Sequence, residues 1–186
     1  MCGLTLQQQR WSEEFTNEHF NWKIIFKSPF LWAFSTKLRN FQYKYLMRIV
    51  ATNKMLFKYN LANSNLCDFC SMEIETVNHL FWICIHTQTF WSKIKQCLSS
   101  KNINITLDLK NITFGIQEKC RYKLVLNFII LSAKYFIYIN KCRNSIPNIE
   151  GYKVYLIKCI DIEKHIALNN DKLQQHCEKW RMFLNT

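Results

Sequence analysis

Three cysteines and a histidine lie within 18 residues of one another, in the spacing Cys67-x2-Cys70-x8-His79-x4-Cys84. Two thiolates separated by two residues can hold one cation from a tight turn, and a histidine and a cysteine from the next segment complete a tetrahedron. Thiolate and imidazole ligands select zinc over magnesium or calcium. Because three thiolates and one imidazole leave no open coordination position, the spacing predicts a structural Zn2+ site rather than a catalytic one.

The spacing of His79 and Cys84 places a condition on the local backbone. On a regular helix, residues five apart are separated by about 140°, so these two side chains cannot share a face. Thr76 has the residue type of a helix N-cap and predicts a helix from there to about Leu98. We therefore expect a distortion or a helix end near Cys84, with His86 as the substitute ligand. The alternative is a set of buried, reduced cysteines beside a surface histidine.

The elements that position these ligands are predicted to be mainly helices. The chain of 186 residues contains only three Gly and two Pro, and a many-stranded fold would need more of both for its tight turns. We expect a mostly α-helical bundle with a small Cys-Cys-His-Cys module held together by zinc. Its parts are a loosely packed polar lead-in at 1–20, a zinc-binding helical module at 21–100 and a C-terminal helical region at 101–186.

Hydrophobic periodicity predicts the remaining elements. A short helix or extended piece is expected within 22–32, a long helix at 119–143, and one or two helices over 152–184 with a break near Asn169. Apolar and polar residues alternate over 103–109. This pattern suits a short strand, or an irregular connector because no partner strand is evident.

Residues 35–50 show the clearest pattern of an amphipathic helix. Its apolar stripe consists of Leu38, Phe41, Tyr45 and Ile49. A stripe of cations borders it, and cations continue over 52–59, a stretch that either extends this helix or begins another. The candidate nucleic-acid-binding residues are Lys37, Lys44, Arg48, Lys54 and Lys58. The alternative is that these cations are solvated surface charges.

Aromatic residues adjoin lysines at 57–59 (Phe-Lys-Tyr) and at 134–136 (Lys-Tyr-Phe). Proteins hold single-stranded nucleic acids by stacking bases on aromatic rings and pairing phosphates with cations. The alternative at each place is that the aromatic rings lie in the core while the lysine amine reaches solvent.

The chain carries a net charge of +12, from 25 Lys and Arg against 13 Asp and Glu. An excess of this size attracts polyanions, chiefly nucleic acid or anionic membrane. The most apolar run, at 124–139, is interrupted by Asn127, Ser132 and Lys134, and a membrane span needs ~20 apolar residues. We therefore expect this run to be a buried core helix and no membrane partner, while the charge by itself does not identify the polyanion and has a solubility surplus as its alternative.

Cysteine usage predicts a reducing compartment. The sequence has nine cysteines, and its first ten residues, MCGLTLQQQR, show neither a basic stretch nor a long apolar run of the secretory type. The cysteines are therefore expected to be reduced core residues or metal ligands. The expected location is nuclear or cytoplasmic, not secreted.

Several stretches together resemble one known family. They are 41–54 (FQYKYLMRIVATNK), 66–70 (LCDFC), 75–84 (ETVNHLFWIC) with Trp91, 114–115 (FG) and 131–138 (LSAKYFIY). They are similar to the reverse-transcriptase zinc-binding domain near the C-terminus of LINE-type (non-LTR) retrotransposon polyproteins. The resemblance covers roughly 22–145. It implies zinc ligation by the four residues above, and the holding of element RNA or target DNA while an upstream polymerase copies RNA.

The residues of a polymerase are not evident in the chain. Such an enzyme needs paired aspartates to hold two magnesium ions, whereas the only adjacent acids are Glu13 and Glu14. No endonuclease set of His, Asp and Glu is evident either. We expect a non-catalytic, retrotransposon-derived module that binds RNA, target DNA or both and accompanies a reverse transcriptase in cis or in trans. The alternatives are a zinc-stabilised protein-interaction scaffold and a non-functional relic of a decayed element.

Overall fold

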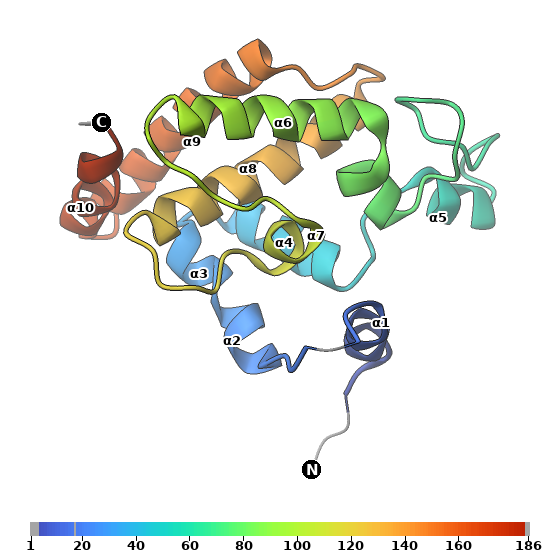
Figure 1. Cartoon of the computed structure of the whole chain (residues 1–186), viewed down its shortest axis with the longest axis horizontal. Helices are drawn as coiled ribbons and strands as arrows, with labels where there is room; N and C mark the ends of the chain where they lie inside the picture. The colour runs from blue at the N-terminus through green and yellow to red at the C-terminus, as the bar shows by residue number, and fades with distance from the viewer. Residues whose placement is uncertain (1–3, 17, 185–186) are drawn as a thin grey trace.

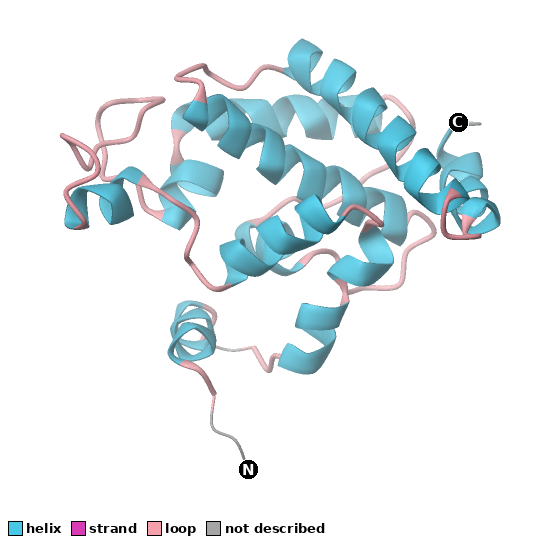
Figure 2. Cartoon of the chain, turned by 180° about the vertical axis from the view of Figure 1, so that it is seen from behind, coloured by secondary structure: helices cyan, strands magenta, loops and turns pink. Residues whose placement is uncertain are grey.

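The computed structural model describes residues 4–16 and 18–184, and helices form nearly all of its regular structure (Figure 1). Seen from behind, the described part of the chain contains helices and loops but no strand (Figure 2). One isolated β-bridge joins Leu66 and Ile74. The prediction of a mostly α-helical bundle from the scarcity of Gly and Pro is therefore confirmed.

One long helix, α8 (Lys123–Cys142), forms the centre of the bundle. It packs against α9 (Ile149–Leu168), α10 (Leu173–Leu184) and two N-terminal helices, α3 (Pro29–Trp32) and α4 (Thr36–Leu46). Its length and hydropathy would also suit a membrane span, but 72% of the apolar window is buried inside the protein. The expectation of a buried core helix is thus confirmed, with its start four residues later than predicted.

The helix predicted over 35–50 is shorter than expected, because α4 ends at Leu46. Arg48 takes a left-handed conformation (φ 53°), and the amides of Arg48 and Ile49 donate to the carbonyls of Tyr45 and Lys44. This pair of bonds closes a Schellman motif, which usually has glycine where Arg48 stands. As a result Ile49 leaves the apolar stripe and is exposed.

The N-terminal helix is attached to the bundle through one buried aromatic side chain. Helix α1 (Leu6–Glu14) begins with a capping box between Thr5 and Gln8. Its Trp11 is fully buried, and the indole Nε1 donates to the carbonyl of Leu46 at 2.8 Å. Trp11 thus anchors α1 on the bundle, whereas the other described residues of 4–16 and 18–20 are exposed or half-buried.

No strand forms over 103–109. Residues 102–108 run as an irregular connector, and α7 (Leu109–Phe114) begins where the Asp108 carboxylate accepts a hydrogen bond from Asn111 at 2.7 Å. Ile103 is buried against the helices. The alternating pattern therefore reflects one extended segment lying on the helical core, without any partner strand in the described residues.

The remaining helices match the predicted positions closely. The stretch 22–32 contains α2 (Trp22–Lys27) followed by α3, and α9 and α10 are separated at Asn169, as expected. Of the two alternatives for 52–59, the structure shows a separate helix, α5 (Asn53–Lys58). It lies at one end of the long axis of the molecule, and α10 lies at the other end (Figure 1).

Candidate metal centre

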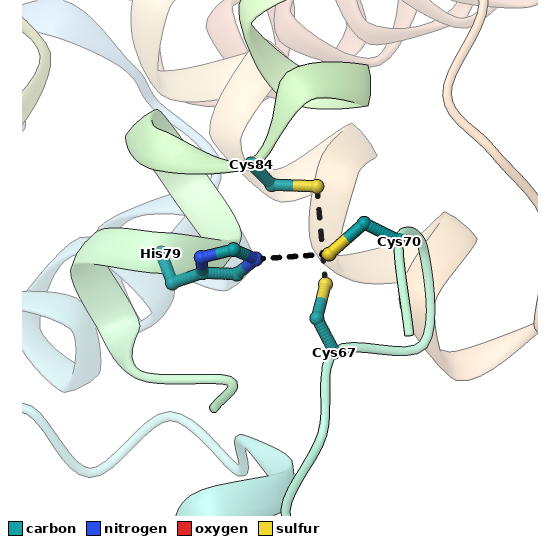
Figure 3. A group of neighbouring side chains, drawn as sticks. All are labelled: Cys67, Cys70, His79 and Cys84. Carbon is teal, nitrogen blue, oxygen red and sulfur yellow. Dashed lines mark hydrogen bonds between the residues drawn. The ribbon is translucent and has the colours of Figure 1, made fainter. Parts of the chain in front are cut away.

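The four predicted ligands converge at the end of the molecule that carries α5. A loop supplies Cys67 and Cys70 (Figure 3). His79 begins a π-helical turn, η1 (His79–Ile83), and Cys84 directly follows this turn. Their ligand atoms all lie within 4.8 Å of one another. His86, the substitute ligand, is half-buried and outside this cluster.

A tight loop brings the first two thiols together. The amide of Cys67 donates to the carbonyl of Glu73 at 2.8 Å, and the amide of Ser71 donates to the carbonyl of Cys67 at 2.8 Å. Ser71 has φ 56°, and the bridge between Leu66 and Ile74 closes the base of the loop. These bonds fold the backbone so that the thiols of Cys67 and Cys70 point toward the same position.

The break expected between His79 and Cys84 is present as a π turn. The amide of Cys84 donates to the carbonyl of His79 at 2.8 Å, and this five-residue bond places the two residues on the same side of the turn. Thr76 caps the turn, because its hydroxyl accepts from the amide of His79 at 3.0 Å. At Cys84 the backbone becomes extended (ψ 132°) before α6 (Ile85–Ser99) begins.

The distances between ligand atoms suit a tetrahedral ion. With bonds of about 2.3 Å to sulfur and 2.0–2.1 Å to nitrogen, tetrahedral geometry requires about 3.8 Å between sulfurs and about 3.5 Å between sulfur and nitrogen. The sulfurs of Cys67 and Cys84 are 3.9 Å apart, and the Cys70 sulfur is 3.4 Å from Nε2 of His79. The four residues therefore fit a closed metal site with Nε2 as the imidazole ligand.

Burial and hydrogen bonding control the protonation of the thiols. The Cys67 thiol donates to the Cys84 sulfur, which lowers the pKa of Cys84 to about 5. The same hydrogen bond, together with burial, raises the pKa of Cys67. One thiolate of the pair is thus favoured even before a cation arrives. Nδ1 of His79 is buried and has no hydrogen-bond partner among the described residues.

A buried carboxylate supports the loop from beneath. Glu75 is fully buried, and its two oxygens accept from the amides of Asn53 at 2.8 Å and Asp68 at 3.2 Å. Burial raises the pKa of Glu75, while these amides and Lys141 oppose the rise. Because Asp68 lies between the two loop cysteines, Glu75 fixes the backbone from which both thiols project.

The same support extends to the central helix through Lys141 of α8. Its Nζ lies 2.8 Å from the side-chain oxygen of Asn53, 3.1 Å from the Asp68 carboxylate and 3.5 Å from Glu75. Lys141 is almost completely buried. Sequence reasoning missed this network, since nothing in the local pattern links a lysine in a distant helix to the metal-binding loop.

The five candidate nucleic-acid-binding cations do not form one cluster. Lys37 and Lys44 are exposed on α4, whereas Lys54 and Lys58 are exposed on α5 beside the metal loop. Arg48 instead faces inward: it forms an ion pair with Glu14, and its guanidinium lies 3.7 Å from the centroid of the Trp11 ring.

The two aromatic stretches have opposite environments. At the end of α5, Phe57 and the following Tyr59 are 47% and 59% exposed, and the Lys58 amine lies 5.9 Å from the Tyr59 ring. In α8, Lys134 is buried, and its amine donates to the side-chain oxygen of Gln42 at 2.5 Å. Only the stretch at 57–59 therefore presents rings and a cation to a ligand.

Comparison with known proteins agrees with this geometry. Residues 6–91 match the family model described as zinc-binding in reverse transcriptase. This segment contains all four metal ligands and ends inside α6. None of the curated proteins compared with the chain matches it.

Proposed function

We propose, from the match of residues 6–91 to the family model described as zinc-binding in reverse transcriptase, that the chain is a zinc-stabilised module that binds nucleic acid. In this proposal it acts beside a reverse transcriptase of a LINE-type element, in cis or in trans, in the nucleus or cytoplasm. The substrate is element RNA, target DNA or both.

Zinc is the proposed ion, because three thiolates and one imidazole favour it and the ligand separations suit its bond lengths. Cys67, Cys70, His79 and Cys84 would hold it. Since they fill four positions, the ion would supply folding energy rather than a reactive water, and this supports a non-catalytic role.

The exposed rings on α5 carry the proposal for nucleic-acid binding. Phe57 and Tyr59 would stack with bases, and Lys54 and Lys58 would pair with neighbouring phosphates. Asn53, the first residue of this helix, donates from its side-chain amide to the Leu66 carbonyl and the Asp68 carboxylate of the metal loop. The ion would therefore fix the position of the binding surface. On α4, Lys37 and Lys44 would add charge.

Binding of single-stranded RNA and DNA across a range of salt tests this proposal. Affinity should fall steeply as salt rises, because each phosphate contact releases a counterion. Replacing Phe57 and Tyr59 together with alanine should weaken binding by roughly 1–3 kcal/mol per lost stacking contact. Absence of binding at low salt would remove the proposal.

A matched control distinguishes a defined site from general attraction to a basic protein. One double variant combines Lys54→Ala with Lys58→Ala on α5. The control double variant combines Lys158→Ala with Lys164→Ala on α9, and it removes the same number of exposed positive charges. The α5 pair should reduce both the affinity and the salt slope more than the α9 pair. Equal losses would indicate unspecific electrostatic binding.

A protein-interaction scaffold is the second candidate, and apolar side chains at the metal loop favour it. Leu61, Met72 and Ile74 are exposed there, and contiguous exposed apolar surface often marks a protein interface. A partner bound by this surface, without any nucleic-acid binding, would support the scaffold. A third alternative, a non-functional relic of a decayed element, would be supported if no translated product were found in the native source.

A further inference from the structure

A groove is lined by residues of α3, of the segment leading into α8 and of α10. Helix α10 lies at the end of the long axis opposite to the metal centre (Figure 1). Its volume is about 660 Å³. Its apolar lining includes Phe30, Leu31, Phe34, Tyr122, Leu124 and Val125. None of these residues takes part in the proposed nucleic-acid surface.

Several large apolar side chains at the edge of this groove are exposed, although the Arg39 guanidinium lies 4.8 Å from the centroid of the Phe30 ring. Leu31 is 70% exposed, Phe30 is 60% exposed and Leu124 is 43% exposed. Contiguous exposed apolar surface beside polar residues marks interaction sites more often than chance would produce. Phe30 and Leu31 belong to α3, whereas Leu124 belongs to α8. The exposed apolar surface is therefore formed by the packing of two helices that are far apart in the sequence.

Cations surround the apolar surface. Lys123, Lys172 and Lys179 line the groove, with Glu178 as the only acid among its lining residues. The Lys172 amine lies 5.9 Å from the Phe34 ring. Lys179 is held more firmly, because its amine donates to the carbonyl of Trp32 at 2.5 Å and lies 4.2 Å from the Phe128 ring.

We propose that this groove binds an acidic amphipathic helix of a protein partner. The apolar face of such a helix would cover Phe30, Leu31 and Leu124, with anchors at the spacing i, i+3, i+4 and i+7. Carboxylates along its edge would pair with Lys123 and Lys172, which complements the positive rim.

Two observations favour a peptide over nucleic acid at this place. Leu31 and Leu124 are branched aliphatic side chains, which pack with other aliphatic groups and give no flat surface for a base. Glu178 would repel a continuous phosphate chain, whereas the carboxylates of a peptide are separated and can avoid it. The groove therefore combines its rings and lysines with exposed aliphatic side chains and one acid, a mixture that suits the apolar face of a peptide better than a strand of bases.

Selection from a displayed library of random peptides of roughly 16 residues, about 24 Å long as helices, tests the proposal on the full zinc-loaded chain. Peptides enriched on the wild type, relative to Leu31→Asp, should be acidic with apolar residues at helical spacing. Measured singly by fluorescence anisotropy, they should bind Leu31→Asp and Lys172→Glu at least roughly tenfold more weakly.

A surface variant away from the groove serves as the control. Ile157→Asp changes an exposed apolar residue of α9 and should leave peptide affinity unchanged. No enrichment over Leu31→Asp, enrichment of basic peptides, or equal weakening by Ile157→Asp would overturn the proposal.

Nucleic-acid binding separates this inference from the proposed function. Nucleic-acid binding should be unaffected by Leu31→Asp and reduced by replacement of Phe57 and Tyr59. Binding of the selected peptides should be reduced by Leu31→Asp and unaffected by replacement of Phe57 and Tyr59. If Leu31→Asp weakened nucleic-acid binding instead, the groove would belong to a nucleic-acid surface and the peptide proposal would fail. Failure of nucleic-acid binding alone would leave the peptide result intact.

Discussion

At the residue scale, Cys70 is the ligand that tests the metal site most directly, because it is the least buried of the three ligand cysteines. Cys70→Ser should lower the zinc content well below one ion per chain and cost at least about 3 kcal/mol of folding free energy. Elemental analysis and thermal unfolding with and without chelator measure both effects.

Cys97→Ser provides the comparison for this change. Cys97 is also half-buried but lies outside the metal cluster, so its replacement should leave the zinc content unchanged. If neither the chelator nor Cys70→Ser changed the melting temperature, the thiols would be ordinary core residues.

The buried lysine of α8 makes stability depend on pH. Burial places the pKa of Lys134 well below its usual value, so the folded chain releases this proton more easily than the unfolded chain does. Below pH 10.5 the unfolded state binds more protons, and stability must fall as pH falls, by up to about 1.4 kcal/mol per pH unit. This loss ends once pH passes below the folded pKa.

Lys134→Met should flatten that dependence. The free energy of unfolding, measured by urea denaturation at several values between pH 7 and 9.5, should rise less with pH in the variant than in the wild type. The lost hydrogen bond to Gln42 changes the absolute stability but not the slope. Parallel curves would show that Lys134 keeps its proton in the core.

The residues of the metal site divide into those that sequence could identify and those that it could not. The four ligands follow from spacing, since this chelating set lies within 18 residues of the chain. Glu75 and Lys141 could not be recognised, because they are 66 positions apart and only the packing of α8 on the loop brings them together. Arg48 was recognised as a cation, but its contact with Trp11 needed the position of α1.

At the scale of elements, a carboxylate from α9 fixes the start of α4. Glu163 is almost completely buried, and its oxygens accept from the amides of Phe34 and Ser35 at 2.7 Å each. An amide side chain can accept only one of these bonds and directs its NH2 group at the other donor. Glu163→Gln should therefore destabilise the fold by about 2–3 kcal/mol in chemical denaturation.

The same helix contains a suitable control for that change. Glu150 is exposed and pairs only with Lys153 on the surface of α9, so Glu150→Gln should change stability by no more than about 0.5 kcal/mol. If the two variants were equally stable, the contact between α9 and the start of α4 would carry no net energy.

Element boundaries were predictable where local signals were sufficient. Asn169 marks the break between α9 and α10, and Thr76 caps the turn before the histidine ligand, as the sequence indicated. The end of α4 was not predictable, because its left-handed residue is Arg48 rather than glycine. The alternation at 103–109 left a short strand and an irregular connector open, and the structure shows the connector, because a helical surface can bury one side of an extended segment as well as a sheet can.

At the scale of the whole molecule, the family match and the folded unit have different boundaries. The match ends at residue 91, yet α8 packs against α3, α4 and η1, and Lys141 bonds directly to the metal-binding loop. The apolar faces of the N-terminal helices have no other cover of comparable size in the described residues. The metal centre and the C-terminal helices should therefore fold as one cooperative unit.

A chain ended at residue 100 tests that expectation. It keeps all four ligands but loses α8, so it should show no cooperative unfolding transition, and its zinc affinity should fall by at least about 10–100-fold because the support of the loop is gone. Circular dichroism during heating and competition for zinc with a coloured chelator measure the two effects. Addition of the separate fragment 101–186 should restore part of both, since the lost contacts are non-covalent. A fragment that melts cooperatively alone and keeps full affinity would make the segment up to 100 an independent domain, with α8 to α10 an attachment that the metal site does not need.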